Sequence, residues 1–341
     1  MLKNNILLNK DRDFREEVFL DWFLWSLKYG DCDPSIWMIN YLFERMEFNI
    51  EQKLWFTWIY GNTYNLPCTW VIWNEFPDFE NADVERIKIW QDKNYANIKY
   101  QTDTKWNKGH LHEMFISYKK LISKNQRIFF KGIMTKDPIK NYHVLYDYIV
   151  KNFHKFGRYI AWFYLQTLRS NCNLLIEPDS LLFLDKGSES HRNGMFYAVG
   201  KDEFVDKKYS DLTENDFQYL EDRAKVILEK VKKVYPNVSY FTMETVLCSF
   251  KKIFREHHIR WKGYYLARQL DDIQKFEKLN WKGIDWDLLY QARKEILHPD
   301  LLNMNMKYMK KNELFYNGGL ITNPIKNNNG YVLPQNFYNI L

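Results

Sequence analysis

The sequence lacks any cysteine arrangement typical of a disulfide framework or a cysteine-rich zinc module. Its 341 residues include only four cysteines, and none of them forms a C-x-x-C pair. Isolated cysteines of this kind favour a reducing compartment over an oxidising one. They are Cys32, Cys68, Cys172 and Cys248.

Long apolar runs are also missing. No stretch approaches the ~20 apolar residues that a membrane-spanning helix needs. The N-terminal residues Met1-Leu2-Lys3-Asn4-Asn5 lack the apolar core and the small-residue cleavage site of a signal peptide. We therefore expect a cytoplasmic protein without a membrane partner.

Aromatic residues, in contrast, are abundant. The 13 Trp, 24 Tyr and 24 Phe make up 18% of the chain. This content supports a large core and excludes a disordered chain, and rings outside the core can stack on nucleic-acid bases. The net charge of +6 is modest, so the distribution of basic residues is more informative than their sum.

Apolar residues recur mainly at helical spacing, and strand-like alternation with hairpin turns is not found, so we predict an all-α fold. A short strand near residues 196–199 is the one alternative left open. Residues 1–302 are predicted to form a single catalytic domain of two lobes, followed by a polar tail at 303–341. Residues 97–109 and 177–194 are expected to be loops. The expected helices are 13–29, 34–46, 51–60, 82–94, 111–123, 142–152, 158–168, 213–234, 241–255, 261–278 and 284–297.

The stretch from Phe153 to Ala161 resembles the turn of a helix-hairpin-helix DNA glycosylase. In that motif, backbone N–H groups at the turn and at the start of the second helix face a DNA phosphate. Gly157 and the small Ala161 fit the pattern, whereas Lys155 replaces the first glycine. The resemblance implies phosphate contacts from Lys155, Gly157 and Arg158. A helix pair broken by a glycine is the simpler alternative.

Asp179 lies 22 residues beyond Gly157, within Pro178-Asp179-Ser180-Leu181-Leu182. Its order and local pattern resemble those of the catalytic Asp of the same glycosylases, which implies a catalytic role. An ordinary helix start capped by Asp179 or Ser180 is compatible with this interpretation. Glycosylases that also cleave the strand have Lys two residues after the hairpin glycine. This chain has Tyr159 there, so an amine-driven lyase reaction is not expected.

Several segments of the sequence resemble segments of a family of phage proteins. The family is identified as amino acid:DNA transferases or alpha-glutamyl/putrescinyl thymine pyrophosphorylases. These segments are residues 64–65, 70–80, 100–110, 190–194 and 241–245. The resemblance as a whole runs from about residue 60 to about residue 295. It implies a glycosylase-like helical fold and a DNA substrate bearing pyrophosphorylated 5-hydroxymethyluracil. A free amino acid or polyamine would displace the pyrophosphate after the base leaves the duplex.

This chemistry requires cations and N–H donors at the departing pyrophosphate and a base for the attacking amine. His191 and Arg192 are candidates for an anion cradle, although Ser190–Gly194 also fits a solvated turn. A second candidate is the polar loop with Asp103, Lys105, Lys108 and His110. Asp103 and His110 could hold a divalent ion, although one carboxylate and one imidazole are weak grounds for it. A divalent metal is therefore left open, and no other cofactor is predicted.

The segment from 241 to 268 has six basic and two acidic residues. Its predicted helix has Glu244, Cys248, Lys252 and Arg255 opposite an apolar stripe, and Lys251 beside them. A solvated face or a phosphate contact by Lys251, Lys252 and Arg255 would explain this pattern. Glu75 and Glu244 are further acid–base candidates, and Glu75 lies among aromatic residues.

Three functions remain open from the sequence. The first is a transferase with Asp179 as base or electrostatic stabiliser, and with Lys105, Arg158, His191 and Arg192 as anion contacts. The second is a DNA glycosylase, in which Asp179 supports attack by water. The third is a non-catalytic DNA-binding module. The mixture of acids, amides and imidazoles around Asp103 and His191 favours an enzyme, because phosphate binding alone needs only donors.

Overall fold

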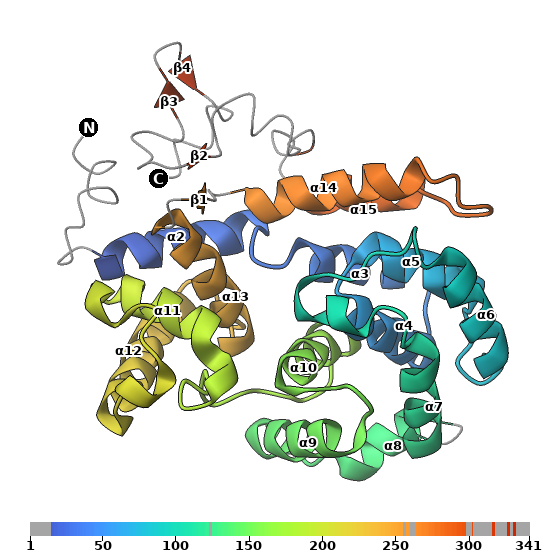
Figure 1. Ribbon diagram of the computed structural model, residues 1–341, viewed down its shortest axis with the longest axis horizontal. Coiled ribbons are helices and arrows are strands. Elements are labelled where there is room, and N and C mark those ends of the chain that lie inside the picture. The colour runs from blue at the N-terminus through green and yellow to red at the C-terminus, as the bar shows by residue number, and fades with distance from the viewer. Residues whose placement is uncertain are drawn as a thin grey trace. The chain divides into compact units, whose positions relative to one another are not determined.

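The computed structural model describes residues 15–122, 125–254, 257–259, 263–297, 302, 316–317, 326–327 and 330–331. Helices dominate this part of the chain, and its strands are two or three residues long (Figure 1). The strands pair as β1 (His257–Ile259) with β2 (Tyr316–Asn317) and as β3 (Lys326–Asn327) with β4 (Gly330–Tyr331), both antiparallel. The predicted all-α class is confirmed. The predicted polar tail lies largely outside the described residues.

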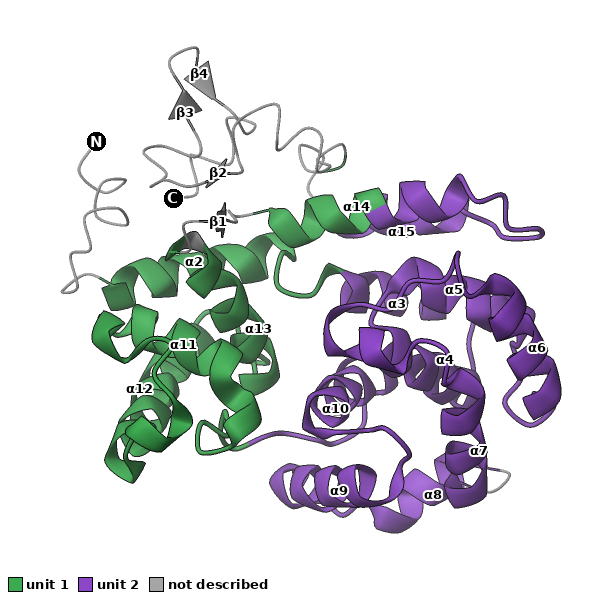
Figure 2. Cartoon of the chain, viewed as in Figure 1, with its two compact units in different colours: residues 1–34, 179–271, 297–341 green, residues 35–178, 272–296 purple. Residues whose placement is uncertain are grey.

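The chain forms two compact units, each built from segments that are distant in sequence (Figure 2). Unit 1 comprises residues 1–34, 179–271 and 297–341, and unit 2 comprises residues 35–178 and 272–296. Within the described residues, no helix combines the length and the apolar character needed to cross a bilayer.

Unit 2 is organised around α4 and α10, which approach each other closely. A Cβ on Gly61 of α4 would lie 3.1 Å from the ring of Tyr164 in α10, so the glycine allows this approach. Ala161 of α10 is fully buried, as the sequence predicted for a close-packed position. The helices are α3 (Pro34–Arg45), α4 (Ile50–Thr63), α5 (Leu66–Glu75), α6 (Val84–Asn94), η2 (Thr102–Asn107), α7 (Leu111–Ile122), α8 (Gln126–Ile133), α9 (Pro138–Asn152), α10 (Arg158–Cys172) and α15 (Asp287–Ile296).

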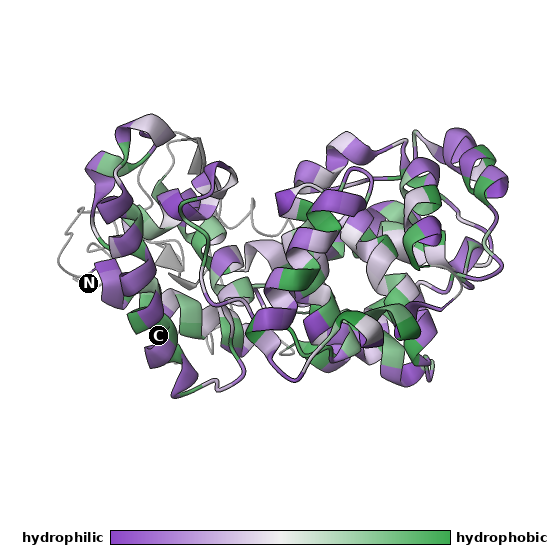
Figure 3. Ribbon diagram, turned by 90° about the horizontal axis from the view of Figure 1, so that it is seen from below, coloured by the Kyte–Doolittle hydropathy of each residue, from purple (hydrophilic) through white to green (hydrophobic). Residues whose placement is uncertain are grey.

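Unit 1 is organised around α11 and α13, whose backbones nearly touch. A Cβ on Gly194 of α11 would lie 2.3 Å from the carbonyl oxygen of Leu247 in α13, so only glycine fits there. Figure 3 shows hydrophilic residues on many of the outer helix turns. The helices are α2 (Arg15–Tyr29), η3 (Lys186–Ser188), α11 (Glu189–Ala198), η4 (Asp202–Phe204), η5 (Tyr209–Asp211), α12 (Glu214–Lys232), α13 (Tyr240–Phe250), η6 (Lys251–Phe254) and most of α14 (Tyr264–Glu277).

Three helices were not predicted. Helix α5 is buried over almost its whole length, so it has no polar face to produce amphipathic periodicity. Helix α8 is only eight residues long. Helix α11 was expected to be loop, with a candidate strand at 196–199, and both expectations are wrong. The predicted helix at 241–255 ends at Phe250 and continues as the 3-10 turn η6.

Candidate functional site

In unit 2 the polar loop and the turn between α9 and α10 are joined. Asn107 Nδ2 donates a hydrogen bond to the carbonyl oxygen of Lys155 over 3.1 Å. The loop is also anchored to the end of α4. The backbone N–H of Gln101 and the hydroxyl of Thr104 both donate hydrogen bonds to the carbonyl oxygen of Thr63, at 2.9 and 3.0 Å. Two stretches that the sequence singled out separately therefore form one surface.

Between these anchors the loop exposes charged and aromatic side chains. Asp103 and Lys105 are exposed, and Trp106 is 73% exposed. The Lys105 ammonium lies 4.8 Å from the centre of the Trp106 ring, and the Lys108 ammonium lies 4.4 Å from the Tyr95 ring. We call Lys105, Trp106, Lys108 and Lys155 the unit-2 face. Within the described residues, Asp103 belongs to no group of three side chains placed to bind a metal.

Two histidines connect the same region to α7. Glu113 Oε2 lies 3.1 Å from His110 Nδ1 and 3.2 Å from His154 Nε2. The hydrogen bond from His110 is the main cause of the lowered pKa of Glu113, and that from His154 adds to it. Glu113 therefore remains ionised near neutral pH and holds both imidazoles beside the turn.

One residue of the turn between α9 and α10 has an unusual backbone conformation. Lys155 has a φ of 59°, in the left-handed region where glycine is at ease, and it stands where that pattern has its first glycine. Gly157 is the N-cap of α10 and is exposed, and an added Cβ there would meet nothing within 4 Å. Arg158 and Tyr159 are half-buried at the start of α10. Phosphate binding by this turn stays a prediction.

Glu75 is not the carboxylate buried among aromatics that the sequence suggested. Its side chain is 38% exposed at the end of α5 and pairs with Arg86 Nη2 over 2.6 Å. The proposed acid–base role of Glu75 therefore has no support in its surroundings.

In unit 1, Asp179 is exposed on a bend, and no helix begins there. The expectation that Asp179 or Ser180 caps a helix is wrong, because the next helical turn starts at Lys186 and is capped by Asp185. The segment is nevertheless fixed. Glu221 of α12 accepts hydrogen bonds from the amides of Leu181 and Phe183, at 3.0 and 2.9 Å.

The pKa of Glu221 is raised, and the Asp179 segment contributes to the shift. Burial is the main cause of its raised pKa, and the nearby charge of Asp179 contributes in the same direction, whereas the two amide hydrogen bonds oppose the shift. The Asp179 loop is therefore held by a carboxylate that lies within electrostatic range of Asp179 itself.

His191, Arg192 and Asn193 lie on α11 and are almost fully buried, with exposed fractions of 2%, 2% and 4%. The predicted solvated turn is therefore wrong. Each buried group has a partner, as buried polar groups generally require. Asn193 Nδ2, for example, donates to Asp206 over 2.8 Å.

Arg192 makes contacts that hold the Asp179 loop in place. Its Nη1 donates to the carbonyls of Phe183 and Asp185 at 3.2 and 3.3 Å. Its guanidinium also lies over the rings of Tyr209 and Phe217, 5.5 and 5.6 Å from their centres. These contacts make Arg192 a positioning residue and do not point to the anion cradle that the sequence suggested.

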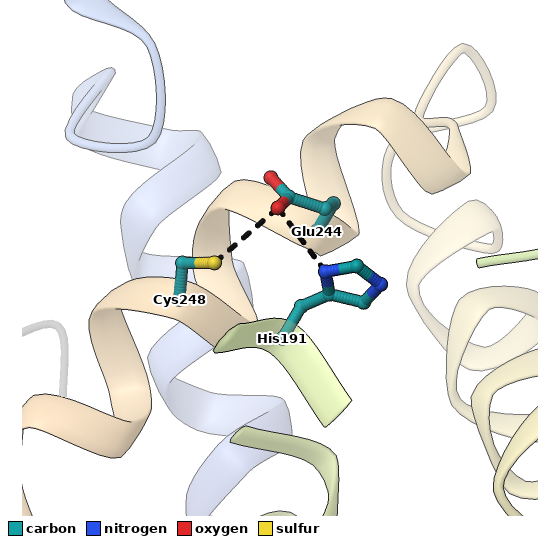
Figure 4. Close-up of side chains that lie close together, drawn as sticks. All are labelled: His191, Glu244 and Cys248. Carbon is teal, nitrogen blue, oxygen red and sulfur yellow. Dashed lines mark hydrogen bonds and ion pairs between the residues drawn. The ribbon is translucent and has the colours of Figure 1, made fainter. Parts of the chain in front are cut away.

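His191 connects the loop to a cluster between α11 and α13. Its Nε2 lies 2.9 Å from the carbonyl oxygen of Leu181, and its Nδ1 lies 3.3 Å from Glu244 Oε1 (Figure 4). A carbonyl only accepts, so Nε2 must carry a proton. Nδ1 is then the ring nitrogen that faces Glu244.

Cys248 completes this cluster. Its Sγ lies 3.3 Å from Glu244 Oε1 and 3.0 Å from Ser190 Oγ, which in turn accepts a hydrogen bond from Lys251 Nζ. Burial first, and then the charge of Glu244, raise the pKa of Cys248 to about 12. The thiol is therefore protonated at neutral pH and is a poor nucleophile by itself.

The helix face at 241–255 that was expected to be solvated or to contact phosphate is largely buried in the described residues. Glu244 and Lys251 are 3% and 6% exposed, because α11 covers the side of α13 that was expected to face solvent. Lys252 is half-buried, with its Nζ 3.5 Å from the hydroxyl of Tyr265. Arg255 lies outside the described residues, so its predicted phosphate contact remains untested.

Sequence reasoning did not recognise Cys248, Ser190, Glu221 or Trp106 as parts of a site. The spacing of Glu244 and Cys248 was a usable signal, because residues four apart share one helix face. No sequence signal marked Glu221, since its partners are backbone amides of a distant segment. The exposure of Trp106 is likewise visible only in the folded chain.

Comparison with known proteins identifies the family of this chain. The profile of the amino acid:DNA transferase family matches residues 28–258, which include the unit-2 face and the cluster around Glu244. A protein named serinyltransferase from Salmonella phage ViI is 27% identical over 270 residues, or 74% of this chain. The chain spans 65% of that relative's length. No solved structure matches the present chain. Because the family profile covers well over half of the sequence, the chain belongs to the amino acid:DNA transferase family.

Proposed function

We propose that this protein transfers an amino acid or a polyamine to a pyrophosphorylated 5-hydroxymethyluracil base in DNA. The observation that carries the proposal is the family match over residues 28–258, within which both candidate regions lie. In the reaction, the amine nitrogen forms a bond to the exocyclic methylene carbon of the base. The carbon–oxygen bond to pyrophosphate breaks, and pyrophosphate leaves with the electron pair while the amine loses a proton.

The residues fall into two roles under this proposal. The unit-2 face contacts DNA, because it combines exposed lysines with an exposed aromatic ring beside the helix-hairpin-helix-like turn. In unit 1, Asp179 accepts the amine proton or holds the amine in line. Its loop is fixed by Glu221, His191 and Arg192, so the carboxylate is preorganised.

Mass spectrometry of nucleosides tests the reaction directly. DNA containing pyrophosphorylated 5-hydroxymethyluracil is incubated with the protein and an amino-acid mixture, digested and compared with a reaction lacking protein. Serine is the first amine to test alone, because the similar phage protein is named a serinyltransferase. We expect an enlarged base. An abasic site would favour the glycosylase alternative, and unchanged nucleosides would favour a DNA-binding module.

Lysines of the unit-2 face should govern the salt dependence of DNA binding. We expect the double variant Lys105→Ala and Lys155→Ala to reduce the slope of log affinity against log salt by about 1–2, because each lost phosphate contact removes about 0.9. Fluorescence anisotropy with a duplex oligonucleotide at several salt concentrations measures this slope. The matched control is Lys131→Ala with Lys140→Ala, which removes two exposed lysines of α8 and α9. Equal slopes for both double variants would contradict the assignment.

Trp106 should contribute to affinity without contributing to the salt slope. Stacking of a base on an aromatic ring is worth about 1–3 kcal/mol, so Trp106→Ala should weaken binding by about 5- to 150-fold, whereas Trp106→Phe should retain most of it. Ile89→Ala is the control, because Ile89 is 67% exposed on α6 of the same unit. If Trp106→Ala binds DNA like Ile89→Ala, the ring does not stack on a base.

A further inference from the structure

A nitrogen, an oxygen and a sulfur donor meet in the cluster between α11 and α13. The atoms His191 Nδ1, Glu244 Oε1 and Cys248 Sγ all lie within 4.8 Å of one another, and Figure 4 shows the three side chains converging. His191 and Glu244 are almost fully buried, and Cys248 is half-buried.

Two of the separations match those around a tetrahedral zinc ion. Zinc binds nitrogen and oxygen at about 2.0–2.2 Å and sulfur at about 2.3 Å, which places neighbouring donors roughly 3.3–3.6 Å apart. Glu244 Oε1 lies 3.3 Å from both His191 Nδ1 and Cys248 Sγ. The third separation, between Nδ1 and Sγ, is no more than 4.8 Å.

The surroundings also suit a metal ligand. His191 Nε2 faces the carbonyl of Leu181 over 2.9 Å, which leaves Nδ1 to coordinate. Backbone carbonyls commonly fix metal-binding histidines in this way. Ser190 Oγ, 3.0 Å from Cys248 Sγ, can donate to a thiolate. The close contact at Gly194 holds the two helices, and therefore the ligands, in a fixed relation.

We propose that His191, Glu244 and Cys248 bind one divalent transition-metal ion of the zinc class. A mixed nitrogen, oxygen and sulfur set selects zinc over magnesium or calcium, which prefer oxygen ligands alone. Three protein ligands leave the fourth position for water or a substrate oxygen, as in catalytic zinc sites. The proposal is independent of the proposed transfer reaction, because the binding of metal can be measured without DNA.

Metal stoichiometry tests the site. The full-length protein is stripped with a chelator, incubated with zinc or cobalt, desalted and analysed for bound metal. We expect one equivalent of zinc, and for cobalt a near-ultraviolet absorption band from thiolate coordination. Cys248→Ala should lose the band and the tight equivalent, whereas Cys68→Ala, which removes a buried thiol in unit 2, should keep both. A wild-type protein that retains no zinc, or equal binding by the two variants, would overturn the proposal.

Thiol alkylation provides a readout on the wild-type chain alone. Of the four cysteines in the sequence, Cys248 is the one that is not fully buried. At alkaline pH, where enough of the thiol is ionised for excess iodoacetamide to label the stripped protein, we expect zinc to slow labelling of Cys248 at least tenfold, as measured by peptide mass spectrometry. Equal labelling rates with and without zinc would show that the thiol is not a ligand.

Discussion

Replacing Asp179 by asparagine is expected to slow transfer about 10²-fold or more while leaving folding and DNA binding intact. The magnitude is that of losing a general base. An amine nucleophile is mostly protonated near neutral pH, so a carboxylate close to the base must remove its proton or align it. Asp179 is exposed on a bend whose neighbouring amides are held by Glu221, so the amide substitution removes charge without removing a helix cap.

Single-turnover kinetics on the pyrophosphorylated substrate measure this effect, with circular dichroism and DNA affinity as checks on folding. Asp222→Asn is the matched control, because Asp222 is an exposed aspartate of α12 in the same unit. If Asp179→Asn and Asp222→Asn turn over equally fast, Asp179 is not the base. The base would then be sought at Glu244 or Asp103, since Glu75 is paired with Arg86 at the surface.

A methyl group added at Gly194 should destabilise unit 1 by roughly 3 kcal/mol or more. The new Cβ would lie 2.3 Å from the carbonyl oxygen of Leu247 and 2.7 Å from its carbon, so two helix backbones would have to separate. Overpacking typically costs about 1–3 kcal/mol, and backbone atoms yield less readily than side chains. His191 lies three residues before Gly194, and Glu244 lies three residues before Leu247. Moving the two helices apart should therefore also disturb the contact between His191 and Glu244.

Urea denaturation of Gly194→Ala, followed by circular dichroism, measures the loss. Gly132→Ala is the control, because a Cβ at Gly132 in α8 would meet nothing within 4 Å. Alanine favours a helix over glycine by about 0.5–1 kcal/mol, so this control should be neutral or slightly stabilised. Equal midpoints for the two variants would mean that α11 and α13 are not packed backbone to backbone.

The sequence alone determined the helical class and most of the helices, because amphipathic helices such as α9 and α12 place their apolar residues at helical spacing. It also indicated the family, which the match over residues 28–258 confirmed. It also predicted that one helix ends at Asn152 and the next begins at Arg158, as α9 and α10 do. The helix-hairpin-helix motif at this turn stays a prediction.

Only the tertiary structure decided which polar residues are buried and which partners they have. Ser190–Gly194 was interpreted as an anion cradle or a solvated turn. Glu244 and Lys251 were expected on or beside an exposed helix face that is either solvated or in contact with phosphate. Propensity and periodicity treat polar residues as exposed, but burial becomes acceptable when each polar group finds a partner. His191 finds Leu181 and Glu244, and those partners come from other segments of the chain. Such pairings depend on which helices pack together, and a local pattern contains no information about that.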